Sequence, residues 1–269
     1  MQLPKNSSDL IKSIKITEVQ IPLDISFILY SREGILPAYT LYRVLPLINS
    51  NTVHIIELYE GLFSLLPYLE VKGNIFLFSN DLNEIKEFID TNWALEQSSI
   101  IFSCSEIKGI KGKVIVNSFN EPLCEINISL SILFSLARSS QNPRLIRLRE
   151  EISNLSDLEE WIISKLNNFS ISNNTEIVLS PIFKPAEIFI DSIIGLKVSS
   201  LDREPKQDEL IIVYTTAEST LVRRYEMRAL KRGKKFKEFL LDVDPILAPV
   251  YLIILISYAK LAGGFNWTS

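Results

Sequence analysis

The order of apolar and polar positions predicts strands that alternate with helices along the first half of the chain. Five short apolar runs have the composition of strands buried on both faces, and most are followed by helical spacing of apolar residues. These runs are 25–30, 53–58, 74–78, 99–103 and 113–117. Strands and helices that alternate at this spacing indicate a parallel sheet covered by helices on both faces.

The segment 74–89 shows this unit most clearly. Its apolar run gives way to a polar loop that begins with Ser79, and apolar residues then return with helical spacing. Backbone N–H groups are free at the start of such a helix, so the loop is a natural place for a phosphate group. Ser79, Asn80 and Asn83 are candidates to add side-chain donors or to cap the helix.

Further helices follow from the apolar spacing elsewhere. They are predicted from about Leu36, over 126–137, around 144–151 and over 155–166. The pattern at 14–21 fits either a short helix or an edge strand, and the sequence leaves both open. A helix is predicted at 247–261, and its run of large apolar residues exceeds what one sheet face requires, so we expect a homodimer.

The second half of the chain repeats the first. Three landmarks occur in the same order in both halves. The first is a strand followed by a serine and by a proline that starts a helix, and the second is a strand followed by a polar loop. The third is an acidic residue before a proline that leads into an apolar helix. They lie at 28–38, 76–83 and 120–137, and again at 178–186, 212–219 and 243–261. We therefore expect two copies of one α/β unit, with domains at 1–150 and 151–269, a boundary within 142–172 and a shortened second copy.

The composition narrows the class of protein. The 269 residues are 47% hydrophobic, which is ample for buried cores, and the net charge of −4 argues against a surface built for nucleic acid or anionic membrane. The longest apolar run contains Pro249 and Lys260 and is shorter than the roughly 20 residues that span a bilayer. No apolar stretch of signal-peptide length opens the sequence, so we expect a cytoplasmic protein.

The cysteine and histidine residues give few candidates for catalysis or metal binding. Cys104 and Cys124 are isolated in the sequence and are expected to be separate, small core residues of a reducing compartment. His54 is the only histidine, so no zinc cluster and no metal or other cofactor is expected. It is the one candidate for a general base at neutral pH, or else a core or interface histidine.

Charged residues give two further candidates. The basic run from Arg223 to Lys237 is either a grip for a polyanion or a solvated face, and the acidic balance of the chain favours the solvated face. Arg32 and Glu125 are expected near the carboxyl ends of strands, where open α/β sheets bind ligands. Arg32 suits either a bidentate phosphate contact or an ion pair with a neighbouring carboxylate, Glu33 or Asp81.

With these elements in order, and with the segments 244–251 and 258–264 at its end, the chain resembles tandem sugar isomerase (SIS) domain proteins in a shortened form. These include the isomerase half of glucosamine-6-phosphate synthase and related sugar-phosphate isomerases and deglycases. The resemblance implies two SIS-like α/β/α sandwiches and a sugar-phosphate ligand. It places that ligand near Ser31, Arg32, Gly34, Ser79, Asn80, Asn83 and Glu125.

The chain departs from that family at its chemistry. The family loop of the type Ser-x-Ser-Gly-x-Thr, which wraps the sugar phosphate, is replaced by a sequence with Asp81 and no glycine. Of the acid, lysine and glutamate on the family's catalytic helix, only an acid, Asp191, has a counterpart, and Lys197 and His54 are the other weak catalytic candidates. The leading expectation is therefore a sugar-phosphate-binding protein without ordinary isomerase catalysis. An active isomerase or deglycase and a non-catalytic regulatory or scaffold protein are the alternatives.

Overall fold

The computed structural model describes residues 1–49, 51–69, 71–108, 110, 112–167, 174–195 and 197–263. The chain divides into two compact units. Unit 1 contains Met1–Leu3 and Ser13–Asn154, and unit 2 contains Pro4–Lys12 and Leu155–Ser269. Residues 168–172 of the expected boundary region 142–172, and the chain ending from Gly264, lie outside the described residues.

Unit 1 is built on a five-stranded sheet in which every pairing is parallel, as expected. Its strands are β1 (Ile25–Tyr30), β2 (His54–Glu57), β3 (Asn74–Phe78), β4 (Ser99–Ser103) and β5 (Val114–Ser118), in the spatial order β2-β1-β3-β4-β5. In the centre, Ile28 is paired with Ile55 on one side and with Phe76 on the other. Both faces are covered, which explains the continuous apolar runs of the inner strands.

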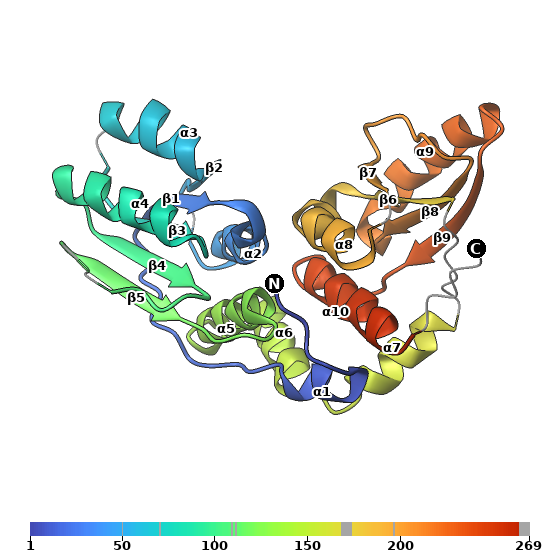
Figure 1. Cartoon of the computed structure of the whole chain (residues 1–269), viewed down its shortest axis with the longest axis horizontal. Coiled ribbons are helices and arrows are strands. Elements are labelled where there is room, and N and C mark those ends of the chain that lie inside the picture. The colour runs from blue at the N-terminus through green and yellow to red at the C-terminus, as the bar shows by residue number, and fades with distance from the viewer. Residues whose placement is uncertain are drawn as a thin grey trace. The chain divides into compact units, whose positions relative to one another are not determined.

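Helices cover the two faces of this sheet (Figure 1). They are α2 (Ile35–Val44), α3 (Leu58–Glu60), the π-helical η3 (Gly61–Leu65), α4 (Leu82–Ala94), α5 (Cys124–Arg138) and α6 (Pro143–Ser153), with the 3₁₀ turns η1 (Arg32–Gly34), η2 (Leu45–Leu47) and η4 (Leu66–Tyr68). Leucines of α3, η3 and η4 and apolar residues of α4 form one core with the sheet. On the opposite face α2 packs on β1 and β3 and also contacts α5, while α6 packs on α5.

The segment 14–21 forms neither the short helix nor the edge strand that its pattern allowed. It runs extended along α5, where three of its backbone N–H groups donate to side chains of that helix. The pairs are Lys15 with Asn127, Thr17 with Ser131 and Val19 with Ser135, each at 2.9 Å. Steps of two residues along the segment match steps of four along the helix, which accounts for the polar positions within apolar α5.

Unit 2 contains a four-stranded parallel sheet in the order β7-β6-β8-β9. Its strands are β6 (Thr175–Leu179), β7 (Val198–Ser200), β8 (Glu209–Tyr214) and β9 (Lys235–Leu240). The apolar pattern did not predict the edge strands β7 and β9. Lys235 and Lys237, expected in a basic helical region or its exit, lie on β9.

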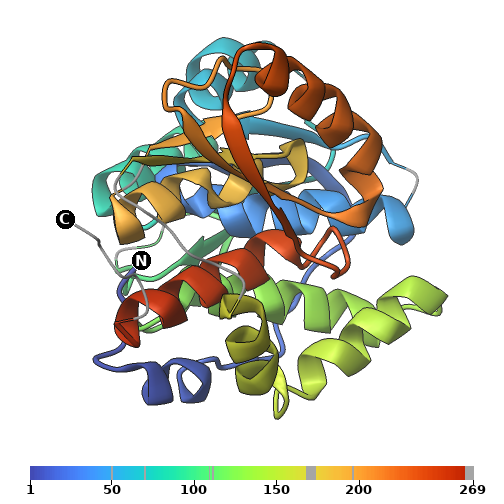
Figure 2. The same ribbon diagram turned by 90° about the vertical axis from the view of Figure 1, so that its right-hand side faces the viewer.

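The helices of unit 2 lie on both faces of its sheet. They are α1 (Ser7–Lys12), α7 (Leu158–Leu166), α8 (Glu187–Ile194), α9 (Ser219–Lys231) and α10 (Ala248–Leu261), with the 3₁₀ segments η5 (Pro181–Ala186) and η6 (Thr216–Glu218). Val222, Tyr225 and Ala229 of α9 join the core on one face. On the other face, α10 packs against η5 and α8, and it also contacts α1 and α7 (Figure 2).

Almost all of α10 is buried, including Tyr251 and the run from Leu252 to Ile256. Because elements of its own unit cover it, its apolar character does not require a second chain, and the expected homodimer remains a prediction. Among the described residues, no helix has the length and apolarity needed to cross a membrane.

The expectation of two separate cysteines is wrong. Cys104, just after β4, and Cys124, the first residue of α5, form a disulfide bond. Twenty positions separate them in sequence, and only the parallel sheet brings the end of β4 to the start of α5, so their isolation along the chain did not reveal the pairing.

Candidate functional site

The order of the strands in unit 1 defines where a ligand is expected. The chain passes from β1 to β2 on one side and then crosses from β2 to β3 on the other side of β1. Open α/β sheets bind ligands at such a switch point, outside the carboxyl ends of the strands. Ser31 follows β1 and Ser79 follows β3, so the structure places both predicted residues at this point.

A third side chain, Glu84 of α4, occupies the crevice between these two serines. The Ser31 hydroxyl donates to Glu84 Oε2 at 2.5 Å, and the Ser79 hydroxyl donates to the same oxygen at 2.7 Å. The two serine oxygens are 3.0 Å apart. All three side chains are buried, and Glu84 is 8% exposed. The hydroxyls predicted to hold a ligand therefore hold a carboxylate of the chain itself.

The backbone donors of the predicted phosphate loop also have an internal partner. Asp81 caps α4, and its Oδ1 accepts from the N–H groups of Asn83 at 2.8 Å and Glu84 at 3.4 Å. Its own N–H donates to the Ser79 hydroxyl at 3.2 Å. The side chain of Asn83 is exposed beside this cap. The N-terminus of α4 is thus satisfied by Asp81.

The loop after β1 shows why glycine stands at position 34. A Cβ on Gly34 would lie 2.1 Å from the Phe78 carbonyl oxygen, so this glycine lets the loop pack against the end of β3. Arg32, the candidate phosphate contact, is exposed and has a left-handed φ of 41°. Glu33 lies 4.0 Å from the Met1 nitrogen.

Asn80 and Glu125 form a second buried group beside the switch point. The Asn80 amide donates to Glu125 Oε1 at 2.9 Å, and its Oδ1 accepts from the Cys104 N–H at 2.9 Å. Glu125 is 1% exposed, and its other oxygen, Oε2, has no hydrogen-bond partner among the described residues. Burial raises the pKa of the Glu125 carboxyl, and the positive Met1 amino group, whose nitrogen lies 3.5 Å from Oε1, acts to lower it.

Cys104, Glu121 and Glu125 bring their ligand-type atoms within 4.8 Å of one another. Because Cys104 is joined to Cys124, it offers no thiolate, which is the form that binds metals. The remaining pair of carboxylates carries no argument for a metal centre.

The three weak catalytic candidates lie away from this edge or on the other unit. His54 is exposed, so the interpretation as a core histidine is wrong, and its ring stacks on Phe27 with centroids 5.4 Å apart. It begins β2 and pairs in register with Phe27, which places it toward the amino edge of the sheet. Asp191 is exposed on α8, and the exposed Lys197 directly precedes β7, at the amino edge of unit 2.

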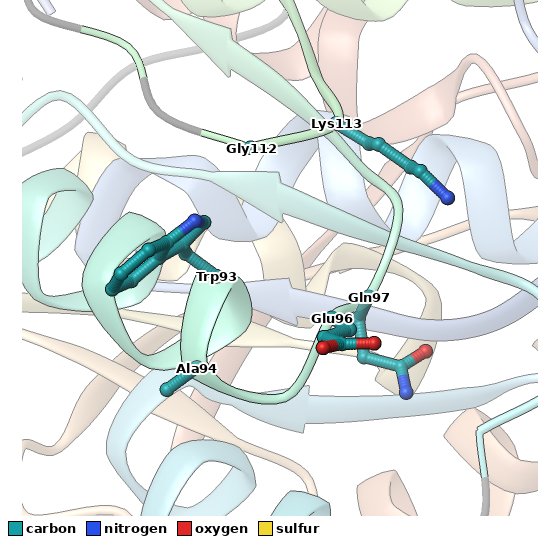
Figure 3. Close-up of a pocket in the computed structure, with 6 residues that line it drawn as sticks. All are labelled: Trp93, Ala94, Glu96, Gln97, Gly112 and Lys113. Carbon is teal, nitrogen blue, oxygen red and sulfur yellow. The ribbon is translucent and has the colours of Figure 1, made fainter.

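Two open hollows lie beside α4. One, of about 420 Å³, is lined by Trp93, Ala94, Glu96, Gln97, Gly112 and Lys113 (Figure 3). It lies where chains enter β4 and β5, at the edge opposite the switch point. The other, of about 530 Å³, runs along α4 past Leu82, Asn83 and Lys86, and Lys108 also lines it. Neither contains the serine pair.

The fold of this chain is similar to that of solved structures of phosphosugar isomerases and of enzymes of amino-sugar phosphates. Glucosamine-6-phosphate deaminase from Thermotoga maritima is similar with a TM-score of 0.66 and 14% identity over 97% of this chain and 92% of that chain. The C-terminal domain of glucosamine-fructose-6-phosphate aminotransferase from Francisella tularensis has a TM-score of 0.63 and 12% identity, covering 95% and 91%. A putative phosphosugar isomerase from Bacillus subtilis has a TM-score of 0.60 and 16% identity, covering 98% and 94%.

No protein-family model and no curated protein matches the sequence. At these identities the structural likeness establishes the fold. The expected α/β class with parallel sheets is therefore confirmed. The expected shortening finds no support, since the chain spans more than nine tenths of each of these three chains.

Proposed function

We propose that this protein is an SIS-type protein without aldose–ketose isomerase activity, whose sugar-phosphate crevice is vestigial and whose role is regulatory or structural. One observation carries the proposal: the Glu84 carboxylate accepts the hydroxyl groups of both Ser31 and Ser79. A sugar phosphate entering this crevice meets a buried anion, and like charges at close range in a poorly solvated site repel strongly. The serine hydroxyls that would bind the phosphate already donate to Glu84.

The second support is the placement of groups for proton transfer. Aldose–ketose isomerisation needs a base to move a proton between C1 and C2, and an acid or its equivalent to open the sugar ring. His54 lies toward the amino edge of its sheet, and Asp191 and Lys197 are exposed on unit 2. Glu125 is beside the crevice, yet its carboxylate is bound to Asn80 and buried.

The similar structures support the link of this fold to sugar phosphates, because the Thermotoga protein is a glucosamine-6-phosphate deaminase and the Francisella domain belongs to a glucosamine-fructose-6-phosphate aminotransferase. A thermal-shift panel of hexose 6-phosphates and their amino forms, followed by an isomerase and deglycase assay, tests the proposal. At 100 times Kd a ligand stabilises by about 2.7 kcal/mol, which such a panel detects. We expect no stabilisation and no turnover.

The same panel decides between the alternatives. Binding without turnover favours a sugar-phosphate-binding protein, and turnover favours an active isomerase or deglycase. The hollow along α4 is an alternative place for binding outside the crevice, since Lys86 and Lys108 line it. The acidic Asp90 and Glu106 line it as well, and Glu106 lies 3.4 Å from the Lys108 ammonium group. Binding that Lys86→Ala weakens, and that Ser79→Ala leaves unchanged, indicates this hollow as the site.

The homodimer and the cytoplasmic location belong to the proposal as well. Light scattering at micromolar concentration tests the dimer, and a stable monomer rules it out. No nucleic-acid partner is proposed. In the basic region the charges have local partners, as in the contacts of Arg232 with Glu204 at 2.6 Å and Lys234 with Asp208 at 2.8 Å.

A further inference from the structure

Unit 2 has a switch point of its own, and a glutamate fills it. The strand order β7-β6-β8-β9 places the change of direction between β6 and β8, as between β1 and β3 in unit 1. Ser180 follows β6 and Thr215 follows β8. The Ser180 hydroxyl donates to Glu218 Oε2, and the Thr215 hydroxyl lies 3.3 Å from the same oxygen.

Backbone groups complete the partners of Glu218. The Ile182 N–H donates to Oε1 at 2.9 Å, and the Thr215 N–H donates to Oε2 at 3.4 Å. Both carboxylate oxygens are therefore bound, one by the loop after β6 and the other by groups at both strand ends. Ser180 and Thr215 are each 1% exposed.

Both units thus place a carboxylate between two hydroxyls, with different surroundings: Glu84 is buried, whereas Glu218 is half-buried and its contacts with Thr215 form the capping box of η6. A hydroxyl follows each central strand, and a glutamate from the helical segment after the second strand lies between them. Glu84 is five residues after its hydroxyl residue, Ser79, whereas Glu218 is three residues after Thr215. The different spacing means that the shared feature is the position of the carboxylate in the crevice, rather than a repeated loop sequence.

We propose that each unit contains an anion-binding site for a small oxyanion, phosphate or carboxylate, and that Glu84 and Glu218 are built-in ligands that keep these sites closed. The inference rests on the proposed function for the crevice of unit 1 and extends it to unit 2. Donors that converge on one carboxylate oxygen from two strands are arranged to bind an anion, and charge-assisted hydrogen bonds of this kind are short and strong. Without the carboxylate, the buried Ser31 and Ser79 hydroxyls keep each other as partners, at 3.0 Å, but lose their anionic acceptor, and Ser180 and Thr215 lose the Glu218 carboxylate.

The size of the space left by a truncated glutamate allows a test with small anions. Truncation of glutamate to alanine removes the carboxylate and one methylene carbon, Cγ, a fragment the size of acetate, and the space left approaches the size of inorganic phosphate. We expect acetate and phosphate each to raise the melting temperature of Glu84→Ala, and of Glu218→Ala, in a saturable manner. Phosphate stabilises folded proteins in general by exclusion from their surface, so every shift is measured against a control.

The matched control is Glu87→Ala, which removes an exposed carboxylate from the same helix as Glu84. A second control, Glu84→Gln, keeps an oxygen acceptor in the crevice and should show no gain in anion binding. The combined variant Glu84→Ala with Ser31→Ala and Ser79→Ala should lose the gain, because the donors are gone. If Glu84→Ala is unfolded without anion, acetate or phosphate is expected to restore the circular dichroism of the folded protein.

Two results overturn the inference: folded alanine variants that shift no more than Glu87→Ala in either anion, or unfolded ones that neither anion restores. Its failure is separate from that of the proposed function. Binding or turnover of hexose 6-phosphates by the unaltered protein contradicts the proposed function. A Glu84→Ala variant that neither acetate nor phosphate stabilises contradicts only the inference that Glu84 is a built-in ligand.

Discussion

At the scale of single residues, the sequence indicated Ser31 and Ser79 as candidate ligand contacts, and it did not indicate Glu84. The hydroxyl oxygens of the two serines lie 3.0 Å apart, and whether they contact a ligand stays a prediction. Glu84 gives no separate signal in the sequence, because an acidic residue in the first turn of a helix is ordinary and suits the helix dipole. A hydroxyl pattern predicts where an anion binds, and it does not tell whether the anion is a ligand or a side chain.

Glu125 gives a prediction about pH. Burial raises the pKa of its carboxyl above the ordinary value of 4.5, Glu121 and Glu33 act in the same direction, and the Met1 amino group opposes them. The contribution of the protonated group to stability is full below the unfolded-state pKa and is lost as pH rises through the raised folded-state pKa. Glu125→Gln stays neutral and keeps an oxygen for Asn80, so it should not lose this contribution.

The measurement is urea unfolding of the unaltered protein and Glu125→Gln over a series of pH values. The free energy of unfolding of Glu125→Gln should increase relative to that of the unaltered protein as pH rises above 4.5. The exposed Glu87→Gln serves as the control. A constant difference between Glu125→Gln and the unaltered protein contradicts the account of Glu125.

At the scale of elements, apolar runs predicted the inner strands well because both faces of these strands are covered. The bounds of β1, β3 and β4 agree with the predicted runs. The edge strand β9, with the sequence KFKEFL, has three charged residues among six, and its apolar pattern is too weak to stand out from the basic helix before it. The segment 14–21 was ambiguous since its hydrogen-bond partners are side chains of α5, 112 or more positions away.

The polar positions on α5 lead to a second prediction. Ser131→Ala removes the partner of the Thr17 N–H in a part-buried hydrogen bond of 2.9 Å, which should cost about 1 kcal/mol of unfolding free energy. Ser129→Ala is the matched control, because the Ser129 hydroxyl donates only within its own helix, to the Glu125 carbonyl oxygen. If urea unfolding gives equal losses of unfolding free energy in the two variants, the hydrogen bond from the segment 14–21 to α5 adds no stability, which contradicts the role given to that segment.

At the scale of the whole molecule, the repeat in the sequence predicted two parallel sheets, and contacts distant in sequence decide which residues join each unit. Helix α1 belongs to unit 2, where Leu10 is fully buried and α1 packs on α10. The sequence pattern does not reveal that α1 belongs to unit 2, because α1 and α10 lie near opposite ends of the sequence. The predicted division at 150 and 151 separates α1 from its partner helix and stays a prediction.

That division can be tested with fragments. Residues 151–269 produced alone lack α1, so α10 loses part of its cover and the fragment should bind hydrophobic dyes and unfold readily. The same fragment with residues 4–12 joined to its N-terminus through a flexible linker should be more stable by several kcal/mol, given that burial of Leu10 alone is worth about 2 kcal/mol. Equal stability of the two fragments argues against α1 as a part of unit 2.

The central claim is that the switch point of unit 1 is closed by Glu84, and calorimetric titration of the unaltered protein with glucosamine 6-phosphate tests it most directly. The titration extends to about 10 mM, so that a millimolar Kd is detected. The account predicts no saturable heat, and the same result for Ser79→Ala. Saturable binding that Ser79→Ala abolishes would place the sugar phosphate in the crevice and contradict the claim.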